Sequence, residues 1–123
     1  PGEYFQDSYS SRYLSRNKKK KWDEPSNTIL ASGRHCPLHP SGLPMKQVGK
    51  GENRTFELQG EVNRRFSVKE IQRIQTFPDD FIFSGSKTSI CKQIGNAVPP
   101  RLAEFLAHFI LYLNSKYNVN ENK

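Results

Sequence analysis

Residues 92–113 have the sequence KQIGNAVPPRLAEFLAHFILYL, in which two prolines precede a run of apolar residues. Proline is well tolerated in the first turn of a helix, so Pro99 and Pro100 indicate where a helix begins. Beyond them, apolar residues recur at the spacing of one helix face: Leu102, Phe105, Leu106, Phe109, Ile110 and Leu113. The stretch therefore predicts a long C-terminal helix whose apolar face requires a partner.

A shorter helix is predicted upstream of this one. Ser67 and Glu70 have the S-x-x-E spacing of a capping box, a pattern that opens helices. Proline cannot continue a helix, so Pro78 predicts that this helix ends within a residue or two of Phe77.

The first half of the chain predicts short strands and a long loop. Residues 26–33 (SNTILASG) and 61–67 (EVNRRFS) have the composition of short strands, with proline and glycine at their borders. Residues 36–53 between them are rich in Gly, Pro and Ser and have no periodicity, so we expect a loop there. The predicted fold class is α+β: an irregular, strand-containing lobe, then a short helix, then a long C-terminal helix.

The chain is strongly basic, with a net charge of +7 and a hydrophobic share of 34% over 123 residues. Six of its Lys and Arg residues lie within residues 12–21, beside Tyr9, Tyr13 and Trp22. Basic residues among aromatic ones favour nucleic-acid binding, and the alternative is a solvated lysine run on a flexible arm. No apolar run is long enough to span a membrane, and the polar N-terminus does not resemble a signal peptide. We therefore expect a cytoplasmic protein with no membrane partner.

Two stretches resemble signature motifs of the bacterial DNA cytosine-5 methyltransferases. RRFSVKEIQRIQTFPDDF (residues 64–81) is similar to the ninth motif of that family, and QIGNAVPP (residues 93–100) to the tenth. Residues 13–40 resemble the target-recognition region of the subgroup that modifies GGCC. The resemblance implies a target-recognition region over residues 1–66 and a helical ninth- and tenth-motif region over residues 67–123.

The resemblance also implies a methyl donor, S-adenosylmethionine. In the family, the turn of the tenth motif helps to line the donor pocket, which assigns Gly95, Asn96 and Ala97 to cofactor binding. Gly95 permits close backbone approach, and the Asn96 amide can bond to the donor's amino-acid end. The helix behind this turn would pack on an α/β cofactor domain. The alternative is that the turn merely begins the helix, which then completes a local core.

The residues expected to bind double-stranded DNA lie mostly near the N-terminus. Arg16 and Arg34 stand where GGCC-modifying relatives carry arginines, so the resemblance implies that both read guanines, whereas Lys18 stands where a relative would have arginine. Phosphate contact is the alternative for each of them. The further DNA-binding candidates are Arg12, Asn17, Lys19, Ser32 and Arg64. The resemblance implies that Arg64 is a scaffold or phosphate-contacting residue.

No catalytic residue is expected in this chain. The family's Pro-Cys-Gln nucleophile and Glu-Asn-Val acid do not occur in it, and neither Cys36 (HCPLH) nor Cys91 (SICKQ) has the context of the nucleophile. Asp79 and Asp80 are expected to cap a turn. We therefore expect the recognition and C-terminal portion of a restriction–modification methyltransferase, whose catalytic portion or large subunit is a partner. The alternative is a free-standing DNA-binding protein.

Two further expectations concern metal binding and association. Zinc binding is an alternative for His35, Cys36, His39 and Cys91, but their spacing fits no standard zinc finger, so no metal site is predicted. The apolar face of the last helix would remain exposed in isolation, so we expect self-association through it.

Overall fold

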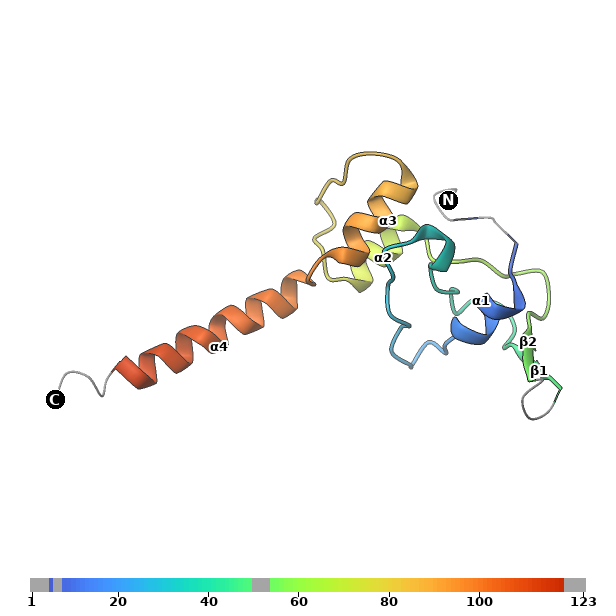
Figure 1. Ribbon diagram of the computed structural model, residues 1–123, viewed down its shortest axis with the longest axis horizontal. Helices are drawn as coiled ribbons and strands as arrows, with labels where there is room; N and C mark the ends of the chain where they lie inside the picture. Colours follow the sequence, from blue (N-terminus) through green and yellow to red (C-terminus); the bar gives the residue numbers. More distant parts are fainter. Residues whose placement is uncertain (1–4, 6–7, 50–53, 119–123) are drawn as a thin grey trace.

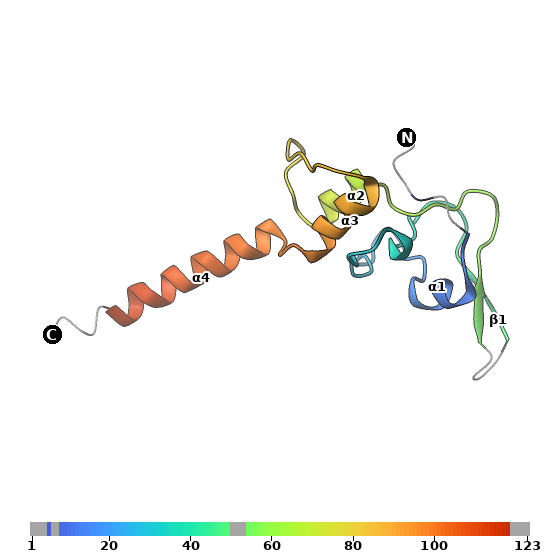
Figure 2. The same ribbon diagram turned by 45° about the horizontal axis from the view of Figure 1, so that its top comes forward.

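The computed structural model describes Phe5, residues 8–49 and residues 54–118. Its elements, in chain order, are α1 (Ser11–Arg16), the 3-10 helix η1 (Gly33–His35), β1 (Lys46–Val48), β2 (Thr55–Glu57), α2 (Val68–Ile74), α3 (Lys87–Asn96) and α4 (Pro100–Asn118). Figure 1 and Figure 2 show α4 extending away from the rest of the molecule, with α2 and α3 between it and the lobe that holds α1, β1 and β2. The predicted α+β class and the long C-terminal helix are confirmed.

The sheet lies in the stretch that the sequence predicts as a loop. β1 and β2 pair antiparallel, with Gln47 opposite Phe56. Phe56 packs against a buried cluster formed by Tyr13, Leu14 and Leu38. A hairpin of three-residue strands is thus supported by burial against α1, which compensates for its weak strand periodicity.

The strands predicted at residues 26–33 and 61–67 are wrong. The first segment has an irregular backbone as far as the start of η1, and the Ser32 amide donates to the Leu30 carbonyl at 2.7 Å. In the second, an isolated bridge joins Leu38 and Arg65, and two backbone bonds of 2.9 Å flank it. The Phe66 amide donates to the Pro37 carbonyl, and the His39 amide donates to the Arg64 carbonyl. Neither segment forms the ladder of a strand.

The capping box at α2 is confirmed. The Ser67 side chain accepts a hydrogen bond from the Glu70 amide, and the Glu70 carboxylate accepts one from the Ser67 amide. The helix ends at Ile74, earlier than the predicted end near Phe77. Thr76 adopts a left-handed backbone with φ of 63°, a conformation that ends the helix.

The same threonine connects α2 to the start of α4. Its hydroxyl oxygen accepts a hydrogen bond of 3.1 Å from the amide of Arg101, one of the first-turn amides of α4 that have no partner within the helix. The direction in which α4 leaves the molecule is thus tied to the end of α2.

The sequence reasoning missed α3, which contains the Gly-Asn pair that it placed in a loop. Ser86 caps this helix by accepting a hydrogen bond from the Ser89 amide, and Gly95 and Asn96 form its last turn. Cys91 and Ile94 of α3 are buried with Ile71 of α2. The same cluster includes residues from the first half of the chain, Ile29 and Cys36.

The apolar face of α4 is exposed to solvent along most of its length. The exposed fractions are 64% for Phe105, 49% for Phe109 and 64% for Ile110. Neither cluster of buried residues includes a residue of α4, within the part of the chain that the structure describes. No described helix is long and apolar enough to cross a membrane.

Candidate nucleic-acid interface

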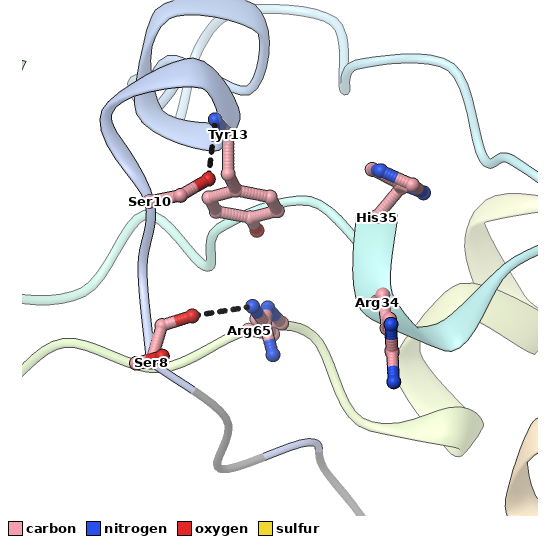
Figure 3. A pocket seen from close by; sticks show the side chains of 6 residues that line it. All are labelled: Ser8, Ser10, Tyr13, Arg34, His35 and Arg65. Carbon is pink, nitrogen blue, oxygen red and sulfur yellow. Dashed lines mark hydrogen bonds between the residues drawn. The ribbon is translucent and has the colours of Figure 1, made fainter.

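The two arginines expected to read bases line two separate pockets. Arg16 lines a pocket of about 300 Å³ together with Asn17, Asn27, Thr28, Leu30 and His35. Arg34 lines a pocket of about 360 Å³ together with Ser8, Ser10, Tyr13, His35 and Arg65 (Figure 3). The two pockets share one lining residue, His35.

Arg16 is the last residue of α1, and its side chain is exposed. The next residue, Asn17, is buried and closes the helix, because its side-chain amide donates to the Tyr13 carbonyl at 3.2 Å. Across the pocket, the Asn27 amide donates to the Lys18 carbonyl at 2.9 Å and so fixes the loop after α1. Asn17 and Asn27 therefore form a framework around Arg16.

The pocket at Arg34 has a rigid aromatic wall. Tyr13 is buried, and its hydroxyl donates to the Cys36 carbonyl. Burial raises the pKa of Tyr13 to about 12, although the neighbouring Arg65 opposes the shift, so the phenol stays neutral. The Arg65 guanidinium lies 4.7 Å from the Tyr13 ring centre and donates to the Ser8 carbonyl at 3.4 Å. Arg34 itself is exposed on η1, opposite this wall (Figure 3).

The two lysines that follow Asn17 have different surroundings. The Lys18 ammonium lies 4.3 Å from the centre of the Phe56 ring, and the residue is exposed. The Lys19 ammonium donates to the carbonyls of Ser41 and Leu43 and to the side-chain oxygen of Asn63, at 2.7, 3.1 and 2.7 Å. Partial burial lowers the pKa of Lys19. Lys19 thus connects three segments of the lobe, whatever its contact with DNA.

Arg64 and Ser32 also have partners within the chain. Arg64 donates to both carboxylate oxygens of Glu70 at 2.7 Å, a two-pronged ion pair that lowers the pKa of Glu70 to about 2. Ser32 precedes η1, and its hydroxyl lies 3.2 Å from Nδ1 of His35. Arg12 is exposed on α1. Of the DNA-binding candidates, Arg12, Arg16, Lys18 and Arg34 are therefore the exposed basic ones.

The paired carboxylates after α2 have a structural role. Asp79 accepts hydrogen bonds from Nε and Nη2 of Arg73 at 2.7 and 2.9 Å, and its carboxylate lies 3.8 Å from the Lys69 ammonium. The Asp79 carboxylate thus anchors the turn to α2 by ion pairs, whereas the sequence predicts a capping role for it. Asp80 is exposed in the same turn.

The residues weighed as zinc ligands occupy different environments. Cys36 and Cys91 are free and buried, and burial raises the pKa of Cys36 to about 12. His39 is buried between Glu70 and the Ser41 amide, which donates to its Nδ1 at 3.1 Å. The described part of the chain holds no group of three or more His, Cys, Asp or Glu residues positioned for a metal ion.

The three residues assigned to the methyl donor lie at the end of α3. A Cβ atom on Gly95 would stand 2.5 Å from the backbone nitrogen of Ala31, so the side of Gly95 that lacks a side chain is filled by the chain's own backbone. Asn96 is exposed, and Ala97 is half-buried. Only Asn96 presents an exposed polar side chain here, which makes its amide the group best suited to hold a polar ligand.

Sequence reasoning overlooked three residues of this surface, namely Asn27, Thr28 and His35. The sequence suggests His35 only as a metal ligand, although it directly follows Arg34. That adjacency is a usable signal, since a residue next to an expected base reader lies close to the same site even when its side chain points another way. For Asn27 and Thr28 the sequence offered no comparable signal.

The chain matches the family described as C-5 cytosine-specific DNA methylase over residues 2–111 and therefore belongs to it. Three curated relatives are similar. Type II methyltransferase M.BsuRI of Bacillus subtilis is 57% identical over 117 residues, covering 87% of this chain and 27% of the relative. M.BspRI of Lysinibacillus sphaericus is 51% identical over 128 residues, covering 95% and 30%. M.MthTI of Methanothermobacter thermautotrophicus is 47% identical over 106 residues, covering 85% and 32%. The chain thus spans less than a third of these relatives.

Proposed function

We propose that this chain is the DNA-recognition and C-terminal portion of a type II DNA (cytosine-5-)-methyltransferase in a restriction–modification system. The complete enzyme would transfer a methyl group from S-adenosylmethionine to cytosine in a short G·C-rich duplex site such as GGCC. The observation that carries the proposal is family membership over residues 2–111, together with relatives named as type II methyltransferases.

Residues 1–66 form the DNA-recognition region in this proposal. Arg16 and Arg34 are exposed, and neither forms an ion pair within the residues that the structure describes. The arginine fork matches O6 and N7 of guanine in the major groove. Lys18 and Arg12 would contact the same DNA, Lys18 as a point charge held near the Phe56 ring.

Residues 67–123 form the region that joins the catalytic portion. The Asn96 amide would bond to polar groups of the methyl donor, with Ala97 beside it, while Gly95 serves this site by letting α3 approach residues 30 and 31. The donor supplies the methyl group. The exposed apolar face of α4 would pack on the α/β cofactor domain of that portion, which supports the assignment of the partner.

The nucleophile must come from the catalytic portion in this proposal. A reactive cysteine needs a lowered pKa and access to substrate. Cys36 has the opposite properties, since it is buried with its pKa raised to about 12, and burial also raises the pKa of Cys91.

A complementation experiment tests the proposal. The purified chain alone is expected to methylate no duplex, and mixing it with a chain that carries the family's nucleophile and glycine-loop motifs is expected to restore 5-methylcytosine formation. Methylation by the chain alone would contradict the proposal. Sequence-selective DNA binding without methylation in the mixture would favour a free-standing DNA-binding protein.

Base reading is tested in the active mixture with duplexes varied one base pair at a time. Arg16→Ala and Arg34→Ala should each lose about 1–3 kcal/mol of discrimination at one base pair. Arg54→Ala, an exposed arginine next to β2 and outside both pockets, is the matched control. Equal loss of rate on every duplex would identify Arg16 and Arg34 as phosphate contacts.

A further inference from the structure

His35 lies between the two arginine pockets. It lines the pocket of Arg16 on one side and the pocket of Arg34 on the other, and no other described residue lines both. Arg34 and His35 are consecutive residues of η1, and Figure 3 shows their side chains leaving that helix in different directions. A DNA segment that meets Arg16 and Arg34 together would therefore pass over His35.

One ring nitrogen of His35 has a hydrogen-bond partner in the chain, and the other is available to a ligand. Its Nδ1 lies 3.2 Å from the Ser32 hydroxyl, and its backbone amide donates to the Ser32 carbonyl at 3.1 Å. The residue is exposed, and Nε2 has no hydrogen bond to a described residue. Ser32 thus fixes the ring orientation and leaves Nε2 able to donate or accept, because a hydroxyl can complement either tautomer.

We propose that His35 is a specificity-determining residue, whose Nε2 contacts a base edge in the major groove next to the bases met by Arg16 and Arg34. Ser32 is its positioning residue. This inference rests on the proposed function. A base edge is favoured over a phosphate because His35 stands between two candidate base readers, and each base pair offers a donor or acceptor in the major groove.

The test uses the reconstituted enzyme and duplexes changed at one base pair at a time. His35→Ala should lose about 3- to 10-fold of discrimination at a single base pair, as expected for one hydrogen bond. That pair should differ from those affected by Arg16→Ala and Arg34→Ala. His35→Gln keeps a donor and an acceptor and should recover part of the loss. Ser32→Ala should weaken discrimination at the same pair by a smaller factor.

His108→Ala is the matched control, because His108 is an exposed histidine on α4, far along the chain from both pockets. Thermal unfolding of each variant separates misfolding from lost contact. A uniform loss on every duplex with a shallower salt dependence would identify a phosphate contact and overturn the inference, as would unchanged discrimination in His35→Ala.

Competition binding with the same duplexes distinguishes the two proposals. It needs no methyl transfer, so an inactive wild-type mixture would count against the proposed function, while selective binding would still decide the role of His35. Selectivity lost at one base pair in His35→Ala supports that role. Wild-type binding without any sequence preference overturns it.

Discussion

The Arg64 guanidinium holds both carboxylate oxygens of Glu70 at 2.7 Å. The same carboxylate accepts the Ser67 amide at 2.7 Å and lies 3.4 Å from Nε2 of His39. A single acidic side chain on α2 therefore joins three points, namely residue 39, residue 64 and the start of its own helix. Removing its charge should loosen all three.

This arrangement predicts a stability that falls in acid. The hydrogen bonds from Arg64 lower the pKa of Glu70 from 4.5 to about 2. A depressed carboxyl pKa contributes stability that is fully present above pH 4.5 and is lost as the pH falls toward 2. Glu70→Gln should cost about 1–2 kcal/mol at pH 7 and should flatten the dependence between those pH values. Urea unfolding at several pH values measures both effects.

Glu61→Gln is the control for this prediction, because Glu61 is exposed and the substitution removes the same charge as Glu70→Gln. It should leave the stability at pH 7 within about 0.5 kcal/mol of the wild type. An acid dependence in Glu70→Gln as steep as that of the wild type would show that other carboxylates carry the effect.

Substitutions of Lys19 and Lys21 should differ in their effect on stability, although both residues belong to the same lysine run. Lys19→Ala removes three hydrogen bonds within the lobe and should destabilise the chain by about 1–3 kcal/mol. Lys21 is exposed, so Lys21→Ala should leave the unfolding temperature nearly unchanged. If Lys21 contacts a phosphate, its loss should reduce the slope of log K against log salt by about 0.9. Equal unfolding temperatures for the two variants would refute the structural role of Lys19.

Substitution of Gly95 should affect packing, whereas substitution of the neighbouring Asn96 should affect donor binding. Gly95→Ala places a methyl group 2.5 Å from the Ala31 nitrogen and should destabilise the chain by about 1–3 kcal/mol. Asn96→Ala changes an exposed side chain and should leave stability nearly unchanged, while weakening donor binding by the reconstituted enzyme. Unfolding curves and equilibrium donor titration distinguish the two. Normal stability in Gly95→Ala would show that residues 30 and 31 can move aside.

The apolar face of α4 should govern association. Phe105→Lys together with Phe109→Lys should abolish self-association of the isolated chain and should prevent assembly with the catalytic portion, since both phenylalanines are exposed. His108→Lys together with Ser115→Lys is the matched control, because both residues lie away from that face by helical spacing. Sedimentation velocity measures the outcome. A monomeric wild-type chain that also fails to bind the catalytic portion would contradict this role for the face.

Local signals in the sequence were sufficient for two helices. The capping box at Ser67 and Glu70 depends on residues three apart, and the face of α4 depends on spacings of three and four, so both are visible without tertiary contacts. α3 escaped prediction because its apolar residues are few and it ends in Gly95 and Asn96, a pair typical of a loop.

The sheet and much of the site required contacts that the sequence does not display. β2 is stabilised by Phe56 packing against α1, a contact between distant segments. The sequence does not distinguish Lys19 from the other lysines of its run, because its partner Asn63 is 44 residues away. By contrast, the exposure of Arg16 and Arg34 could be predicted from the sequence, because arginine side chains are seldom buried.

The hydroxyl of Thr76 holds α4 at one end only, by its hydrogen bond to the Arg101 amide. α4 has 19 residues and, at a rise of about 1.5 Å per residue, measures about 28 Å from root to tip. A rotation of about 10° at the bond between Thr76 and the Arg101 amide would move the tip sideways by roughly 5 Å, about half the diameter of a helix. A small change at the end of α2 therefore produces a large sideways displacement of the tip of α4 across any surface on which the helix lies.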